Sequence, residues 1–114
     1  TIILVGKNNL QNEQVSFKLS RRGDLWFHVK DIPGSHVLIT GNANPSDETI
    51  TFAGELAAYF SKARYSNLVQ VDVLDVKKLH KPTGTAPGFV TYDREKTIRV
   101  TPDESVIKSR KIGK

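Results

Sequence analysis

Cysteine and methionine are both absent from this chain of 114 residues. Without cysteine there is no disulfide, no thiolate metal site and no cysteine nucleophile. Without methionine there is no initiator residue, so we expect either a processed chain or a domain cut from a longer protein. No run approaches the ~18 consecutive apolar residues of a membrane-spanning helix, so no membrane insertion is expected. The lack of cysteine fits a reducing compartment such as the cytoplasm, although some extracellular domains also lack cysteine.

Length and composition are those of an ordinary globular domain. Hydrophobic residues make up 38% of the chain and charged residues 25%. A chain of this length forms one domain with its own core, so residues 1–114 are predicted to be a single domain. The glycine-rich segment 84–88 lacks the Gly-Lys-Ser/Thr end of a phosphate-binding loop, and we expect a turn there and no cofactor.

The formal charge of +5 is concentrated in the C-terminal third of the chain. Residues 1–76 contain seven Lys/Arg against eight Asp/Glu, whereas residues 77–114 contain ten against four. The excess lies in two segments, residues 77–81 and the tail 108–114. Clusters of positive charge favour polyanions such as nucleic acid, although a solvated loop and a frayed terminus give the same pattern.

The hydrophobic pattern predicts an α+β fold. Strands are expected over residues 2–5, 25–29, 36–40, 69–76, 89–92 and 97–100. Helices are expected over residues 10–20, from Ser46 or Asp47 to Arg64, and from Pro102 onward. Residues 15–19 also alternate as a strand would. The resulting architecture is a mainly antiparallel sheet with one long helix packed on a face and a short N-terminal helix.

One strand is unusual in its polar face. Because side chains alternate along a strand, Asp24, Trp26 and His28 share one side. Trp26 is the only tryptophan in the chain, and the alternation allows two interpretations, a core residue or an exposed binding residue. His36 begins the following strand.

Metal and nucleophilic chemistry are both poorly supported. Asp24, His28, Asp31 and His36 offer nitrogen and oxygen ligands, but their spacing matches no metal signature. Ser35 and His36 are adjacent on a strand and point to opposite faces, which argues against a nucleophile–base pair. We therefore predict a non-catalytic binding domain with no metal.

An RNA-binding interpretation uses more of these residues. Stacking on Trp26 would be combined with hydrogen bonds from His28 and His36, and Trp26→Ala would weaken binding without unfolding the domain. Lys7, Arg21, Arg22, Lys30 and Lys81 would supply charge, and Asn8, Asn9 and Asn12 would supply amide hydrogen bonds. Alternatively, Asn8 or Asn9 caps the first helix.

Three segments carry a family resemblance. Residues 5–13 (VGKNNLQNE), 24–37 (DLWFHVKDIPGSHV) and 81–90 (KPTGTAPGFV), together with the helix over 56–64, closely resemble the NFACT-R domain. This domain stands at the C-terminus of the bacterial fibronectin/fibrinogen-binding protein family, also called RqcH. The resemblance covers nearly the whole chain.

The resemblance implies a role in ribosome quality control. Family members bind large ribosomal subunits that carry an obstructed nascent chain, recruit tRNA and support alanine tailing of that chain. The domain would contact tRNA together with the N-terminal NFACT domain of the same protein, and Asp24, Trp26 and His28 match the family's functional motif. The alternative implied by the older family name is a cell-surface adhesin module that binds fibronectin.

Overall fold

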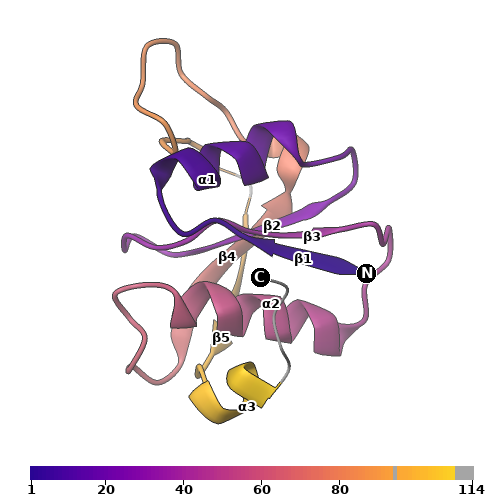
Figure 1. Ribbon diagram of the computed structural model, residues 1–114, viewed down its shortest axis with the longest axis vertical. Coiled ribbons are helices and arrows are strands. Elements are labelled where there is room, and N and C mark those ends of the chain that lie inside the picture. The colour runs from indigo at the N-terminus through magenta and orange to yellow at the C-terminus, as the bar shows by residue number, and fades with distance from the viewer. Residues whose placement is uncertain (94, 110–114) are drawn as a thin grey trace.

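Five antiparallel strands form the central sheet of the computed structural model, which describes residues 1–93 and 95–109 (Figure 1). The strands are β1 (Ile2–Val5), β2 (Leu25–Val29), β3 (Val37–Thr40), β4 (Val69–Asp75) and β5 (Lys96–Val100). They are arranged in the order β1-β3-β2-β4-β5, and each strand pairs antiparallel with its neighbours. The α+β prediction is confirmed.

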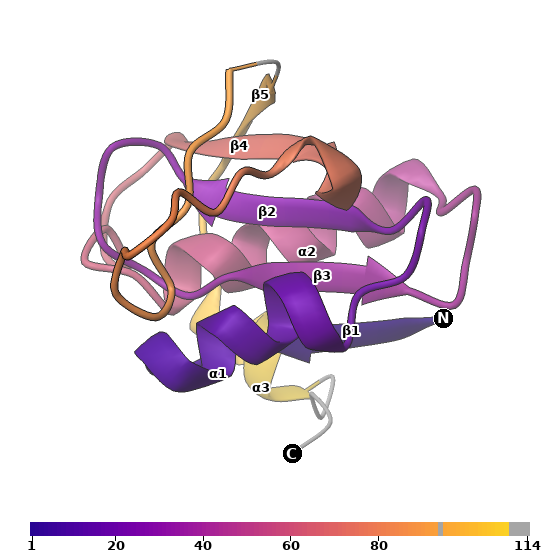
Figure 2. The ribbon, with the colours of Figure 1, turned by 90° about the horizontal axis from the view of Figure 1, so that it is seen from above.

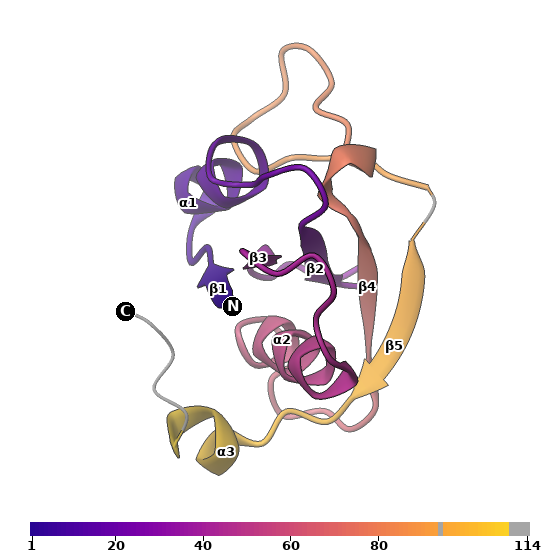
Figure 3. The same cartoon turned by 90° about the vertical axis from the view of Figure 1, so that its right-hand side faces the viewer.

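The long helix α2 (Asp47–Tyr59) covers one face of this sheet (Figure 3). Ser46 caps its start, because the Ser46 hydroxyl accepts the Thr49 amide at 3.2 Å. Its buried side, including Phe52 and Leu56, packs against Phe27, Val29 and the valines of β4 in the larger of two hydrophobic clusters. The predicted helical face is therefore confirmed.

The helix ends five residues earlier than the expected Arg64. The Ser61 hydroxyl donates to the Ala58 carbonyl at 2.7 Å, and the Phe60 carbonyl accepts the Ser35 amide at 3.0 Å. The turn before β3 thus takes up a carbonyl at the helix end, and Gly34 forms an isolated antiparallel bridge with Ser61. Helical periodicity does not report tertiary contacts of this kind, so it did not predict where the helix ends.

A second helical layer covers the opposite face of the sheet. Helix α1 (Asn9–Glu13) continues into the π-helical turn η1 (Gln14–Lys18), where the Leu19 amide donates to the Gln14 carbonyl at 2.8 Å (Figure 1). The short N-terminal helix is confirmed, although its second half is π-helical. This layer helps to bury a second hydrophobic cluster, formed by Val15, Trp26, Leu38, Leu74, Val76 and Leu79.

The strand expected over residues 89–92 is not formed. Only Thr91 pairs, by exchanging two backbone hydrogen bonds of 2.9 Å with His80. Strand β5 instead joins the edge of β4, from Val69 opposite Val100 to Val73 opposite Lys96. The final helix α3 (Glu104–Ser109) is confirmed, and part of the basic tail lies outside the described residues.

Candidate nucleic-acid interface

Four exposed cations meet at one end of the sheet. These are Arg21, Arg22, Lys77 and Lys78. The first two lie in the turn before β2 and the other two in η2 (Val76–Lys78), the short 3-10 helix after β4. The Val76 amide donates to the Asp24 carbonyl at 2.9 Å, which holds the two segments side by side (Figure 2). None of the four forms an ion pair within residues 1–93 and 95–109. We call this group the basic end.

Asp24 shapes the turn that carries two of these cations. Its carboxylate is buried and accepts the Arg21 amide at 2.7 Å, and its own amide donates to the Arg21 carbonyl at 3.0 Å. Gly23 closes the turn with φ of +91°, a conformation that favours glycine. Asp24 therefore positions the loop, and its side chain is not presented to a ligand.

Trp26 is fully buried, with 0% of its surface exposed. Its indole N–H donates to the Ser16 hydroxyl at 2.8 Å, and its ring meets those of His36 and Tyr92 edge-on at 5.0 and 5.2 Å. The prediction that Trp26 offers a stacking surface is wrong for this fold, because α1 and η1 cover the face of β2 on which it lies.

His36 is a buried neutral base. Its Nδ1 lies 2.7 Å from the Ser16 hydroxyl. That oxygen also accepts from the Trp26 indole, and the direction of its hydrogen bond with Nδ1 depends on the tautomer of His36. Burial lowers the pKa of His36 to about 4, and the neighbouring His28 adds to the effect. Only 4% of His36 is exposed, so it supports the fold and does not reach a phosphate.

His28 reaches the surface from the same strand face. It is half-buried, and its ring lies nearly parallel to that of Trp26, with centroids 5.8 Å apart. Burial lowers the pKa of His28, an effect that the Asp72 carboxylate opposes. Of the three residues predicted on this face of the strand, His28 is the one with an accessible ring.

The three asparagines serve different purposes. Asn8 caps α1, because its side-chain oxygen accepts the Gln11 amide at 2.8 Å, so the alternative interpretation of Asn8 is confirmed. Asn12 is buried and accepts the His36 amide at 2.9 Å.

Asn9 is exposed, as is Lys7, whose ammonium lies 4.8 Å from the Phe60 ring centroid. Lys7, Asn8 and Asn9 line a cavity of about 380 Å³ between α1 and the end of α2.

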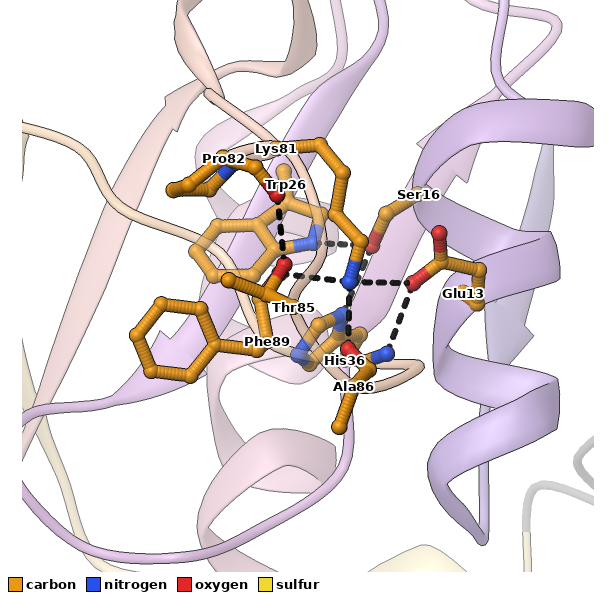
Figure 4. A network of polar contacts seen from close by, with 10 residues as sticks. Glu13, Ser16, Trp26, His36, Lys81, Pro82, Thr85, Ala86 and Phe89 are labelled. Carbon is orange, nitrogen blue, oxygen red and sulfur yellow. Dashed lines mark hydrogen bonds and ion pairs between the residues drawn. The ribbon is translucent and has the colours of Figure 1, made fainter.

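Lys81 is the centre of a clasp that fastens the loop 82–89 to α1 (Figure 4). Its ammonium bonds the carbonyls of Ala86 and Phe89 and lies 3.3 Å from the Glu13 carboxylate. Glu13 in turn accepts the Gly88 amide at 2.7 Å, the main cause of its lowered pKa. The Lys81 ammonium is thus engaged by a carboxylate and two carbonyls of the domain itself.

Lys30 is likewise ion-paired. Its ammonium lies 2.8 Å from the Asp72 carboxylate and 3.1 Å from that of Glu95, and the hydrogen bonds to Asp72 and then Glu95 raise its pKa to about 12. Asp72 is buried and also accepts the Tyr92 hydroxyl at 2.6 Å. The Lys30 ammonium is therefore paired with two carboxylates of the domain, which makes it a poor partner for a phosphate.

The sequence interpretation missed two features. Phe89 was placed in the expected strand over 89–92 and given no functional role, whereas it is a large apolar residue, 51% exposed, at the end of the clasped loop. The sequence also gave no sign that Lys77 and Lys78 lie next to Arg21 and Arg22, because only the pairing of β2 with β4 brings these segments together. The signal for Phe89 was the glycine before it, which ends the turn.

Among the described residues, no three His, Cys, Asp or Glu side chains form a metal-binding group. No helix in that part of the chain is long and apolar enough to cross a membrane.

Relatives of this chain carry consistent names. A protein of Streptococcus suis named "Rqc2 homolog RqcH" is 70% identical over 112 residues, which is 98% of this chain and 20% of the relative. A Bacillus subtilis protein of the same name is 52% identical over 110 residues, or 96% of this chain and 19% of the relative. The chain therefore spans about a fifth of the length of these relatives.

A solved structure agrees with the fold. The C-terminal part of the fibronectin/fibrinogen-binding protein from Streptococcus suis superposes with a TM-score of 0.92 at 70% identity, covering 94% of this chain and 43% of that one. Residues 1–92 match the family described as the NFACT protein RNA binding domain. This chain is a member of the NFACT RNA-binding domain family.

Proposed function

We propose that this chain is the tRNA-contacting module of a ribosome quality control factor. The full-length protein would act on obstructed large ribosomal subunits and support alanine tailing of the stalled chain, with its N-terminal NFACT domain gripping the same tRNA. The family description, the names of the relatives and the basic end support this role. The family description refers to RNA, so RNA binding is preferred here to the adhesin alternative.

The basic end carries the proposal. These four exposed cations lie on two turns joined by a backbone hydrogen bond, and none of them is ion-paired within the described residues. They suit the phosphate backbone, which is recognised by charge and not by base sequence. Lys7, Asn8, Asn9 and His28 are accessible and are proposed as further RNA contacts. Asp24, Asn12, Trp26 and His36 are buried and would act by holding the surface in shape.

A pair of charge-matched double variants tests the proposal. Arg22→Gln with Lys78→Gln removes two cations from the basic end, while Lys96→Gln with Arg99→Gln removes two exposed cations from β5. We expect the first pair alone to weaken tRNA binding, and to reduce the slope of log affinity against log salt by about 1.5. Binding would be measured by filter retention at several KCl concentrations.

The two double variants can also contradict the proposal. Equal losses of affinity in both would show that net charge alone determines binding and that the basic end has no special role. The same variants in the full-length protein should lose co-sedimentation with large ribosomal subunits. Unchanged co-sedimentation, together with retained fibronectin binding at the cell surface, would favour the adhesin role instead.

A further inference from the structure

A cavity of about 350 Å³ opens beside the end of β2, away from the basic end. Its lining includes the side chains of His28, Asp31, Phe89 and Tyr92, with Trp26 and His36 below them. Five of the ten lining residues carry aromatic rings, histidines included, and Asp31 is the one carboxylate among the ten. Two cations near this lining are held in ion pairs: Lys30, which precedes Asp31 in the chain, and Lys81, whose charge acts on His36. The cavity therefore suits a planar, uncharged group better than a phosphate.

Phe89 provides an exposed ring on a fixed backbone. Half of its surface is accessible, and its backbone is held, because its carbonyl accepts from Lys81 at 3.1 Å and its amide donates to the Ala86 carbonyl at 3.1 Å. Figure 4 shows Phe89 beside the clasp, on the same side as Trp26. A ring held in this way can stack on a ligand without the entropy cost of ordering a free loop.

Asp31 provides a hydrogen-bond acceptor at the rim. It is exposed, and its φ of +58° is a left-handed conformation that only a few residue types adopt readily. An ionised carboxylate accepts hydrogen bonds and donates none, so it favours a partner edge that carries amino groups. His28, stacked on Trp26, lines the same cavity.

We propose that this cavity binds one unpaired nucleobase of the RNA, stacked on Phe89 with its amino-bearing edge toward Asp31. The inference rests on the proposed RNA-binding function and adds a base-reading site to its phosphate-binding surface. Adenine, cytosine and guanine carry an exocyclic amino group and uracil does not. The pocket should therefore prefer those three bases to uracil, whereas the basic end has no such preference.

Oligonucleotides with and without bases test the proposal. Fluorescence anisotropy of end-labelled ten-nucleotide oligoadenylate, oligouridylate and a fully abasic strand would be measured with the 114-residue chain. We expect Phe89→Ala to weaken oligoadenylate binding about tenfold, Phe89→Tyr to retain it, and abasic binding to stay unchanged in both. Asp31→Asn, which tolerates the left-handed backbone, should remove the preference for oligoadenylate over oligouridylate.

The basic-end double variant separates the two proposals. Arg22→Gln with Lys78→Gln should weaken all three ligands alike, because each carries phosphates. If that variant has its expected effect while Phe89→Ala affects abasic and base-bearing strands equally, or neither, the base pocket is disproved and the RNA-binding function stands. If no strand binds even at low salt, both proposals fail. Circular dichroism of each variant would exclude unfolding as the cause of a loss.

Discussion

The indole N–H of Trp26 donates to the hydroxyl of Ser16 at 2.8 Å, across the interface between β2 and the π-helical turn η1. The same hydroxyl meets Nδ1 of His36 at 2.7 Å, so one serine joins three elements of the fold. The only tryptophan of the chain therefore makes a buried hydrogen bond from within an apolar cluster.

Trp26→Ala should unfold or severely destabilise the domain. The ring is completely buried, and removing a buried aromatic side chain costs about 3 to 5 kcal/mol of the free energy of unfolding. Urea denaturation followed by circular dichroism measures the loss. The matched control is Phe89→Ala, which truncates an exposed ring and should change stability by less than about 1 kcal/mol. A well-folded Trp26→Ala protein would contradict the assigned burial.

Ser16→Ala should lower the free energy of unfolding by about 1 to 3 kcal/mol. The substitution leaves the buried Trp26 N–H and His36 Nδ1 without a partner, and unsatisfied buried polar groups carry that cost. Ser20→Ala removes a hydroxyl that donates to the Ser16 carbonyl at 2.8 Å from a partly buried position, so its effect should be smaller. Equal losses would show that the bridging hydroxyl has no special role.

Stability should fall as the pH falls from about 6.5 to about 4. The folded-state pKa of His36 is depressed to about 4, so in this window the unfolded chain binds a proton that the folded protein excludes. His28 shifts in the same direction, and Glu13 and Lys81 are the other charged groups that act on His36. A shift of this size corresponds to about 3 kcal/mol at most.

The measurement is urea unfolding at several pH values between 7 and 4. His36→Asn keeps a side-chain acceptor near Ser16 but cannot be protonated, so the pH dependence should flatten. His80→Gln replaces an exposed histidine and should leave the curve in place. If His36→Asn retains the full pH dependence, the assignment to His36 is wrong.

Lys81→Met should release the loop 82–89 while the rest of the domain stays folded. The substitution keeps the apolar stem and removes the ammonium that holds two loop carbonyls and Glu13. We expect amide hydrogen exchange at Gly88 and Phe89 to rise about tenfold, with global stability changed by less than about 1 kcal/mol.

Glu13→Gln is the matched variant for this loop. It removes the ion pair but retains an oxygen that can accept the Gly88 amide, so exchange should rise less than in Lys81→Met. Exchange that is unchanged in both variants would show that the clasp does not hold the loop.

Local pattern predicted most of the secondary structure, because alternation and helical periodicity report which sides of an element are apolar. The strand over 25–29 and the start of the helix capped by Ser46 lie where that pattern placed them, and the final helix begins close to its expected start. Alternation on β2 also separated Trp26 and His28 from Phe27. It did not reveal what covers each face, and the helical layer over Trp26 is a tertiary contact between separate elements.

The charged residues show the same limit. Lys30 and Lys81 have the composition of phosphate contacts, but their partners Asp72, Glu95 and Glu13 come from other elements. Conversely, Arg22 and Lys78 are far apart in the chain and become neighbours only through the pairing of β2 with β4. Charge can be counted in a sequence, but whether it is neutralised depends on the fold.

Helices lie on both faces of the sheet, and apart from His28 the proposed RNA contacts lie outside its strands. Substitutions of Trp26 in the interior and of Phe89 at the end of the loop 82–89 would both score as lost RNA binding in a screen. One would score through depletion of folded molecules and the other through a direct contact. Only a parallel measurement of soluble protein would sort such mutants into those that report on architecture and those that report on the ligand.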